Sequence, residues 1–258
     1  DFALLLLSLS LVAYVPKPYR YAPLALLFLS LSFTPPVQKD APLKIKLIAT
    51  DIKQEKKWQQ ESLQPTLQLI FGEINKAIDE GYEVVVLPES VFPFYMNKAP
   101  TVLVKLQELS HEISIVAGTL LREDEQHYNV TYMFENGEYQ IAKKMILVPF
   151  GEYIPLPSFI KEFVNEFFFA GASDFKTADK PTDFIIKGVK FRNAICYEAT
   201  CKEIYEEGVD FVLATSNNAW FYPSIEPTLQ KLLIRFYARK NGTTVYHAAN
   251  WMGSGVVK

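Results

Sequence analysis

The feature that most constrains the fold is the segment E-V-V-V-L-P at residues 83–88, in which only apolar residues follow Glu83. A strand that is apolar on both sides must be covered on both sides, as in a buried parallel sheet. A helical pattern over about 60–80 precedes this run and stops at Gly81, and another over about 99–111 follows it. This alternation of helices with a buried strand predicts a layered α/β fold.

The rest of the chain continues the same alternation. Asn136-Gly137 separates two strand-like runs and is a typical turn of a β-hairpin. The other expected strands are 44–50, 113–121, 128–135, 139–142, 183–187, 189–195, 209–215 and 243–249, and the other expected helices are 199–206 and 226–241. The sequence therefore predicts one α/β domain over residues 43–258, preceded by a segment of different character, residues 1–37.

That N-terminal segment contains two runs without charged residues, 2–15 and 21–37. No basic stretch precedes them, so a cleaved signal peptide is not indicated. Because both runs lack a polar face, we expect transmembrane helices, with a buried helical hairpin as the alternative. The loop between them carries Lys17 and Arg20, which the positive-inside rule places in the cytoplasm. Residues after Pro36 are then expected beyond the membrane, in the periplasm of a Gram-negative cell.

The composition excludes several classes of function. The net charge of −3 and the pI near 5.8 provide no basic field, so we expect no nucleic-acid partner. His111, His127 and His247 lack the spacing of metal ligands, and no glycine-rich phosphate loop appears, so we expect no metal and no cofactor. Two cysteines do not make a disulfide framework.

Three reactive residues are expected at the ends of strands: Glu89, Lys144 and Cys196. A thiol attacks as the thiolate, so it needs a base such as a carboxylate and a nearby cation. A lysine can stabilise both the thiolate and the oxyanion of a tetrahedral intermediate, and the backbone N–H after Cys196 is a candidate second oxyanion donor. Each residue also has an ordinary alternative. Glu89 could cap a helix, Lys144 could end a solvated hairpin, and Cys196 could be a buried apolar filler.

Longer motifs surround these residues: L-P-E-S (87–90), K-M-I-L-V-P-F-G-E-Y-I-P (144–155), A-I-C-Y-E (194–198), S-N-N-A-W-F (216–221) and I-A-T-D-I-K-Q-E-K-K-W (48–58). Together they resemble the nitrilase superfamily, and within it the apolipoprotein N-acyltransferase family. The combination of L-V-P-F-G-E-Y with I-C-Y-E is fairly specific, whereas L-P-E alone is not.

The resemblance implies a nitrilase-like α-β-β-α sandwich on a membrane anchor. Carried over by position, Glu89 is the general base, Lys144 the lysine that stabilises the intermediate, and Cys196 the nucleophile. The resemblance also implies supporting roles for Glu152, Glu198 and Tyr197, and substrate contacts for Trp58 and Asn217.

The implied reaction moves an acyl chain from a phospholipid to Cys196 as a thioester, and then to the α-amino group of the diacylglyceryl-cysteine of an apolipoprotein. The expected partners are these two substrates and the bacterial inner membrane, and the expected state is a monomer. Two aromatic segments, 91–96 and 163–170, are candidates for a lid or a membrane contact, with ordinary core as the alternative. The other open readings are a membrane-anchored amidase with the same three residues, and a membrane-anchored binding protein without catalysis.

The chain departs from the family pattern at five positions: Asn218, Tyr222, Tyr237, Lys240 and Thr243. Most of the family's membrane helices and its closing segments are absent, so we expect a piece of a longer protein. We also expect Cys201 to be buried and turned away from Cys196, because a disulfide between them would remove the nucleophile in an oxidising compartment.

Overall fold

The computed structural model describes residues 2–30, 36–148, 152 and 175–258. The chain divides into two compact units, residues 1–37 and 38–258. The first unit contains helix α1 (Phe2–Tyr14) and the 3-10 helix η1 (Ala22–Ser30), and the Ser8 hydroxyl donates to the Pro23 carbonyl oxygen at 2.9 Å.

The described part of the chain has no helix that combines the length and the apolar character needed to cross a membrane. Helix α1 has 13 residues, which at about 1.5 Å per residue falls short of a hydrocarbon core of about 30 Å. The second apolar run forms a 3-10 helix of nine residues instead of the expected long α-helix. The expected pair of transmembrane helices is therefore not confirmed.

The second unit is built on two five-stranded sheets. The first sheet has the order β1 (Ile45–Leu47), β2 (Val84–Val86), β3 (Ser114–Glu123), β4 (Gln126–Glu135), β5 (Glu138–Lys143). The second has the order β10 (Gly255–Val257), β9 (Thr244–Asn250), β8 (Phe211–Asn217), β7 (Val189–Ile195), β6 (Asp183–Ile186). The helices are α2 (Gln54–Lys57), α3 (Gln60–Asp79), α4 (Pro100–Leu109) and α6 (Glu226–Asn241), with short 3-10 helices η2 (Met96–Lys98), η3 (Cys196–Thr200), η4 (Lys202–Tyr205) and η5 (Asn218–Phe221).

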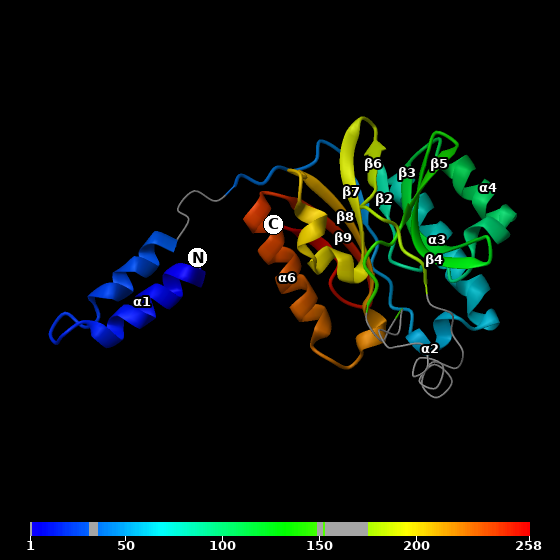
Figure 1. The fold of residues 1–258 in the computed structure, drawn as a ribbon. Coiled ribbons are helices and arrows are strands. Elements are labelled where there is room, and N and C mark those ends of the chain that lie inside the picture. The colour runs from blue at the N-terminus through cyan, green and yellow to red at the C-terminus, as the bar shows by residue number, and fades with distance from the viewer. Residues whose placement is uncertain (1, 31–35, 149–151, 153–174) are drawn as a thin grey trace. The chain divides into compact units, whose positions relative to one another are not determined.

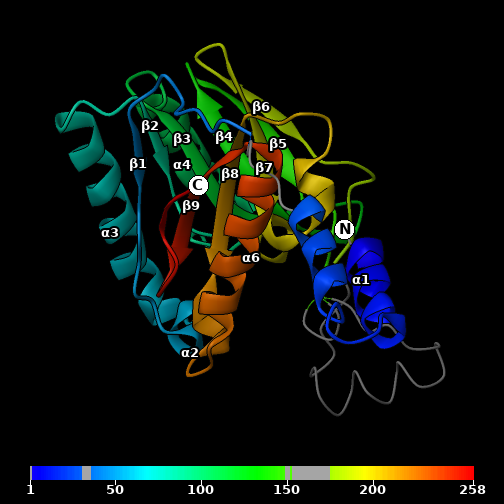
Figure 2. The same cartoon turned by 90° about the vertical axis from the view of Figure 1, so that its left-hand side faces the viewer.

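Each sheet contains three neighbouring parallel strands, β1–β2–β3 at one edge of the first sheet and β7–β8–β9 in the centre of the second, and antiparallel strands complete it. Helices α3 and α4 lie on the outer side of the first sheet, and α6 lies on the outer side of the second (Figures 1 and 2). The second unit is therefore a four-layer α-β-β-α sandwich, and the predicted fold is confirmed.

Three apolar clusters fill the three spaces between these layers. Strand β2 shows how the sequence specifies them, because its side chains alternate between two of the clusters. Val84 and Val86 pack between the sheets, while Val85 packs against the helices over the first sheet. All three are fully buried, which confirms the inference from the continuous apolar run.

Most of the turns and helix ends that local sequence signals predicted are present in the structure. Asn136 and Gly137 have φ of 51° and 82° and join β4 to β5, as the hairpin prediction requires. Gly81, with φ of 72°, follows the end of α3. The predicted helix over 199–206 is instead the pair of 3-10 helices η3 and η4, and α2 and β10 were not predicted.

The two aromatic segments proposed for a lid or membrane contact have different outcomes. In segment 91–96, Phe92 and Met96 are fully buried in the cluster between the first sheet and its helices, so the ordinary-core alternative is correct there. Segment 163–170 lies outside the described residues.

The space between the sheets yields a stability prediction. Phe191 is fully buried there, with its ring centroid 5.5 Å from that of Phe211. We expect Phe191→Ala to lower the free energy of unfolding by about 3–5 kcal/mol in denaturant titrations. Ile185→Thr is the control, because Ile185 is 48% exposed and threonine is also β-branched. This substitution should change the free energy of unfolding by about 0.5 kcal/mol or less. Equal effects of the two substitutions would contradict the layered packing.

Candidate active site

The second unit brings the three predicted reactive residues into one cavity of about 360 Å³. Glu89 follows β2, Lys144 follows β5 and Cys196 follows β7, so both sheets contribute. Their exposed fractions are 6%, 1% and 7%. A buried carboxylate, ammonium and thiol around one cavity are the groups that acyl transfer through a thioester requires.

Lys144 lies between two carboxylates. Its Nζ is 2.8 Å from each carboxylate oxygen of Glu152 and 3.7 Å from Glu89 Oε1. Burial lowers the pKa of Lys144, but the negative charges of Glu152 and Glu89 outweigh burial and raise it above its ordinary value. The two carboxylates therefore favour the ammonium form of Lys144.

Asn129 on β4 bridges the same two carboxylates. Its Nδ2 donates to Glu89 Oε1 at 2.8 Å and to Glu152 Oε1 at 3.0 Å. The second oxygen of Glu89 accepts the backbone N–H of Asn217 at 2.8 Å, so both oxygens of this carboxylate are fixed. Asn129 was not predicted, because β4 also carries Gln126, His127, Thr131 and Glu135, so a polar residue in this strand is no signal by itself.

Cys196 lies at a sharp turn between β7 and η3. Its φ is 55°, in the left-handed region that a residue with a Cβ rarely adopts. Burial raises the pKa of the Cys196 thiol, the charge of Glu89 raises it further, and Lys144 acts in the opposite direction. Burial therefore favours the neutral thiol, and the Glu89 carboxylate lines the same cavity.

Glu198 connects the lysine segment to this turn. Its Oε2 accepts the N–H of Ile195 at 2.7 Å, and its Oε1 accepts the N–H groups of Met145 and Ile146 at 2.5 and 3.0 Å. Burial raises its pKa, although Lys144 and these N–H groups act in the opposite direction. One buried carboxyl thus holds the residues after Lys144 next to the residue before Cys196.

A side-chain amide faces the thiol from α6. Gln230 Nε2 lies 3.8 Å from Cys196 Sγ, and Asn218 Nδ2 donates to Gln230 Oε1 at 3.0 Å. Asn218 is one of the departures from the family pattern, and its Nδ2 also donates to the Met252 carbonyl oxygen at 2.8 Å. This side chain therefore helps to hold the amide of Gln230 in place.

Of the other predicted site residues, some line the cavity and others lie outside its lining. Trp58 lines the cavity and is 48% exposed. Asn217 is buried and is not among the residues that line the cavity; its side chain lies 2.8 Å from those of Gln54 and Asn250. Tyr197 follows the thiol with an exposed ring that is not part of the cavity lining.

Cys201 is a free thiol, as Cys196 is. It lies between η3 and η4, and its Sγ is 3.4 Å from the carbonyl oxygen of Tyr197. It is only half-buried, so the expectation that it is buried was wrong.

The other four departures form packing contacts and are not among the residues that line the cavity. Tyr222 contacts the Trp251 ring edge-on, Tyr237 stacks on Tyr205, Lys240 lies over Phe236, and Thr243 Oγ1 donates to the Val209 carbonyl oxygen.

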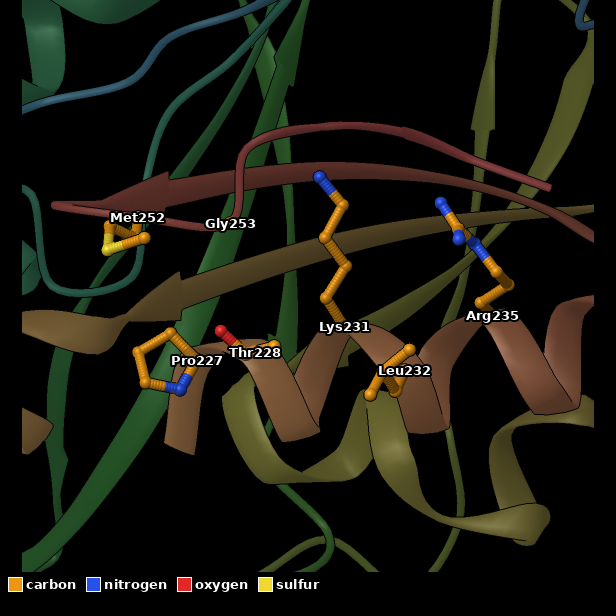
Figure 3. A pocket seen from close by; sticks show the side chains of 7 residues that line it. All are labelled: Pro227, Thr228, Lys231, Leu232, Arg235, Met252 and Gly253. Atoms are coloured by element: carbon orange, nitrogen blue, oxygen red, sulfur yellow. The ribbon is translucent and has the colours of Figure 1, made fainter. Parts of the chain in front are cut away.

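A smaller hollow of about 190 Å³ lies beside α6. Lys231 and Arg235 extend from the same side of the helix, and Met252 and Gly253 lie across from its first turn (Figure 3). The lining of this hollow contains no thiol and no carboxylate, so it lacks the groups that the larger cavity combines. Among the residues that the structure describes, no group of three or more His, Cys, Asp or Glu side chains could hold a metal ion.

Comparison with known proteins gives the class that this fold and cavity define. The family model of the carbon-nitrogen hydrolases matches residues 51–257, and the chain belongs to that family. Among solved structures, the chain is similar to a CN-hydrolase superfamily protein from Xanthomonas campestris, with a TM-score of 0.60 and 15% identity, over 81% of this chain and 76% of the other. It is also similar to an amidase from Nesterenkonia sp., with a TM-score of 0.59 and 18% identity, over 86% and 81% of the two chains.

Curated relatives with higher sequence identity narrow the comparison to one branch of the family. The apolipoprotein N-acyltransferase of Wolinella succinogenes is 45% identical over 100% of this chain and 63% of its own length. That of Campylobacter jejuni is 38% identical over 92% of this chain and 53% of its own length. The chain therefore spans between half and two thirds of the length of these relatives.

The close approach of β3 to Glu89 predicts the effect of a glycine substitution. A Cβ on Gly118 would lie 2.5 Å from Glu89 Cα and 2.6 Å from the backbone nitrogen of Ser90. Because backbone atoms must then shift, we expect Gly118→Ala to lower the free energy of unfolding by about 1–3 kcal/mol in denaturant titrations. In the control Gly72→Ala no atom lies within 4 Å and the residue is inside α3, so stability should rise by about 0.5–1 kcal/mol. A stabilising Gly118→Ala would refute this close packing.

The charge on Lys144 predicts the reactivity of the thiol. In a Cys201→Ser background, Lys144→Met should slow alkylation of Cys196 by iodoacetamide about tenfold or more at neutral pH, since each pKa unit by which the thiol rises removes about 90% of the thiolate. Lys143→Met is the control, because Lys143 pairs with Glu123 at the surface and its loss should leave the rate unchanged. Equal alkylation rates in both variants would show that Lys144 does not act on the thiol.

Proposed function

We propose that this protein transfers an acyl chain from a phospholipid, through a thioester on Cys196, to the α-amino group of the diacylglyceryl-cysteine of an apolipoprotein. The observation that carries the proposal is the single cavity that holds a buried thiol, a carboxylate and a fixed ammonium. The curated relatives named apolipoprotein N-acyltransferase support this choice of substrates. We place the protein at the bacterial inner membrane, as a monomer with its cavity open to the periplasmic side.

In the first half-reaction, Glu89 takes the proton of the Cys196 thiol as Sγ attacks the ester carbonyl of the phospholipid. Lys144 and the backbone N–H of Tyr197 stabilise the oxyanion. When the ester C–O bond breaks, Glu89 returns the proton to the departing glycerol oxygen. The products are the Cys196 thioester and a lysophospholipid.

In the second half-reaction, the α-amino group of the lipoprotein attacks the thioester carbonyl. Glu89 takes a proton from the amine, and Lys144 again stabilises the oxyanion. The C–S bond breaks, an amide remains on the lipoprotein, and the proton passes from Glu89 to Sγ. This restores the neutral thiol that the burial of Cys196 favours.

The lining of the cavity is consistent with a lipid chain. Its polar residues include the two carboxylates, Lys144 and Asn129, whereas the apolar residues are Trp58, Leu120, Val148, Phe175, Trp220 and Phe221. Trp58 and Trp220 are 48% and 64% exposed, so aromatic surface is available to an acyl chain at the mouth of the cavity. We propose that Trp58 contacts this chain and that Asn217 acts by fixing the carboxylate of Glu89.

The proposal predicts a covalent intermediate. After incubation with phosphatidylethanolamine in detergent, the intact mass of the protein should rise by one acyl chain, and hydroxylamine should remove that added mass. Cys196→Ser should show no hydroxylamine-sensitive adduct, whereas Cys201→Ser should acylate like the parent because Cys201 lies outside the cavity lining. Acylation that persists in Cys196→Ser would exclude this nucleophile. An unmodified parent protein that hydrolyses a small amide would favour the amidase alternative.

A further inference from the structure

A second buried lysine lies next to the reactive cluster. Lys57 is the last residue of α2, directly before Trp58, and only 3% of it is exposed. Its Nζ donates to the backbone carbonyl oxygen of Glu89 at 3.0 Å. A buried ammonium is costly unless its N–H groups find acceptors and its charge is compensated, so this position calls for a physical explanation.

The surroundings of Lys57 supply acceptors but no direct ion pair. With its amide oxygen turned toward them, the Asn217 side chain accepts from Lys57 Nζ and from Trp220 Nε1, each at 3.1 Å. Within the described residues, no carboxylate oxygen lies within 4.0 Å of Lys57 Nζ. The negative charges that act on it are that of Glu89 and, once the thiol has lost its proton, that of the Cys196 thiolate.

A charge count shows what this ammonium contributes. Glu89, Glu152 and Lys144 carry a net charge of −1, and Lys57 brings these four side chains to zero; the buried carboxyl of Glu198, which accepts backbone N–H groups, lies outside this count. The net charge stays at zero when Glu89 takes the proton of the thiol, because one anion replaces another. Without Lys57 the thiolate would form in a buried group that already carries an uncompensated negative charge.

We propose that Lys57 is a positioning residue of the transfer reaction, which fixes the backbone of Glu89 and supplies the second positive charge that the Cys196 thiolate requires. This inference rests on the proposed function of the same cavity. It assigns a role to a residue for which the sequence predicted none, although Lys57 lies in the motif at residues 48–58 that resembles the family.

The protonation of Lys57 gives the proposal a pH signature. Burial lowers the pKa of Lys57 to about 8, although Glu89 and Cys196 act in the opposite direction. Glu55 and Lys56, on the same helix, are exposed. Above that pKa the ammonium becomes neutral and its attraction for the thiolate is lost. Reaction of the thiol should therefore rise less steeply with pH above about 8 than ionisation of the thiol alone would give.

The test is the pH profile of Cys196 alkylation by iodoacetamide, measured on the full chain in a Cys201→Ser background. In the parent protein, we expect the increase of the alkylation rate with pH to flatten above about pH 8. Lys57→Met should react about tenfold more slowly than the parent below that pH, and its rate should rise without the flattening. Lys57→Arg should restore the rate, also without the flattening, because a guanidinium stays charged. Lys56→Met, which alters the exposed neighbour, should match the parent.

Two outcomes would overturn the inference: a Lys57→Met profile that matches the parent, or a flattening near pH 8 that persists in Lys57→Arg. The second remains decisive if Lys57→Met fails to fold. Iodoacetamide needs no lipid, so this result is separate from the lipid experiment. If the Lys57 variants change the alkylation profile but phospholipid does not acylate the parent protein, the role of Lys57 is supported and the proposed substrate is rejected. If the variants leave the profile unchanged but phospholipid acylates the parent, the substrate is supported and the role of Lys57 is rejected.

Discussion

The site depends on one interaction, the shared contact of Glu89 and Glu152 with the ammonium of Lys144. Two buried carboxylates that share one cavity repel each other unless a cation lies between them. Lys144 contacts both carboxylate oxygens of Glu152 at 2.8 Å, and Asn129 donates to both carboxylates. The desolvation of the three charges is thus offset by hydrogen bonds as well as by their attraction, and the carboxylate of Glu89 has a fixed direction.

This cluster requires the two-sheet architecture. Glu89, Asn129 and Lys144 come from the first sheet, whereas Cys196 comes from the second. The apolar cluster between the sheets, which includes Val84, Val86 and Phe191, fixes the distance between them. Glu198 then holds the residues on either side of the site through its backbone hydrogen bonds, and the left-handed turn at Cys196 is maintained by that surrounding structure.

Sequence patterns could predict the elements that local chemistry determines. The run of valines in β2, the Asn136-Gly137 hairpin and the stop at Gly81 each follow from a rule about neighbouring residues, and each is confirmed. Reasoning about strand ends, together with the family motifs, also selected the three residues that the cavity brings together. Asn129, Gln230 and Lys57 could not be predicted in this way, because their importance comes from partners that are 32 to 40 residues away in the chain. Full burial of a lysine from a charged stretch is likewise a property of the tertiary structure. In segment 91–96 the sequence left a lid, a membrane contact and ordinary core all open, and the burial of Phe92 in the apolar cluster decides for core.

The central claim is that the acyl group leaves Cys196 for an amine and not for water. The most direct test is a single-turnover experiment that starts from the isolated acyl-enzyme and adds a synthetic diacylglyceryl-cysteine peptide. The account predicts that the acyl mass leaves the protein and appears on the peptide amine as an amide, with little free fatty acid. Release of free fatty acid at the same rate with and without the peptide would contradict the account and identify a hydrolase.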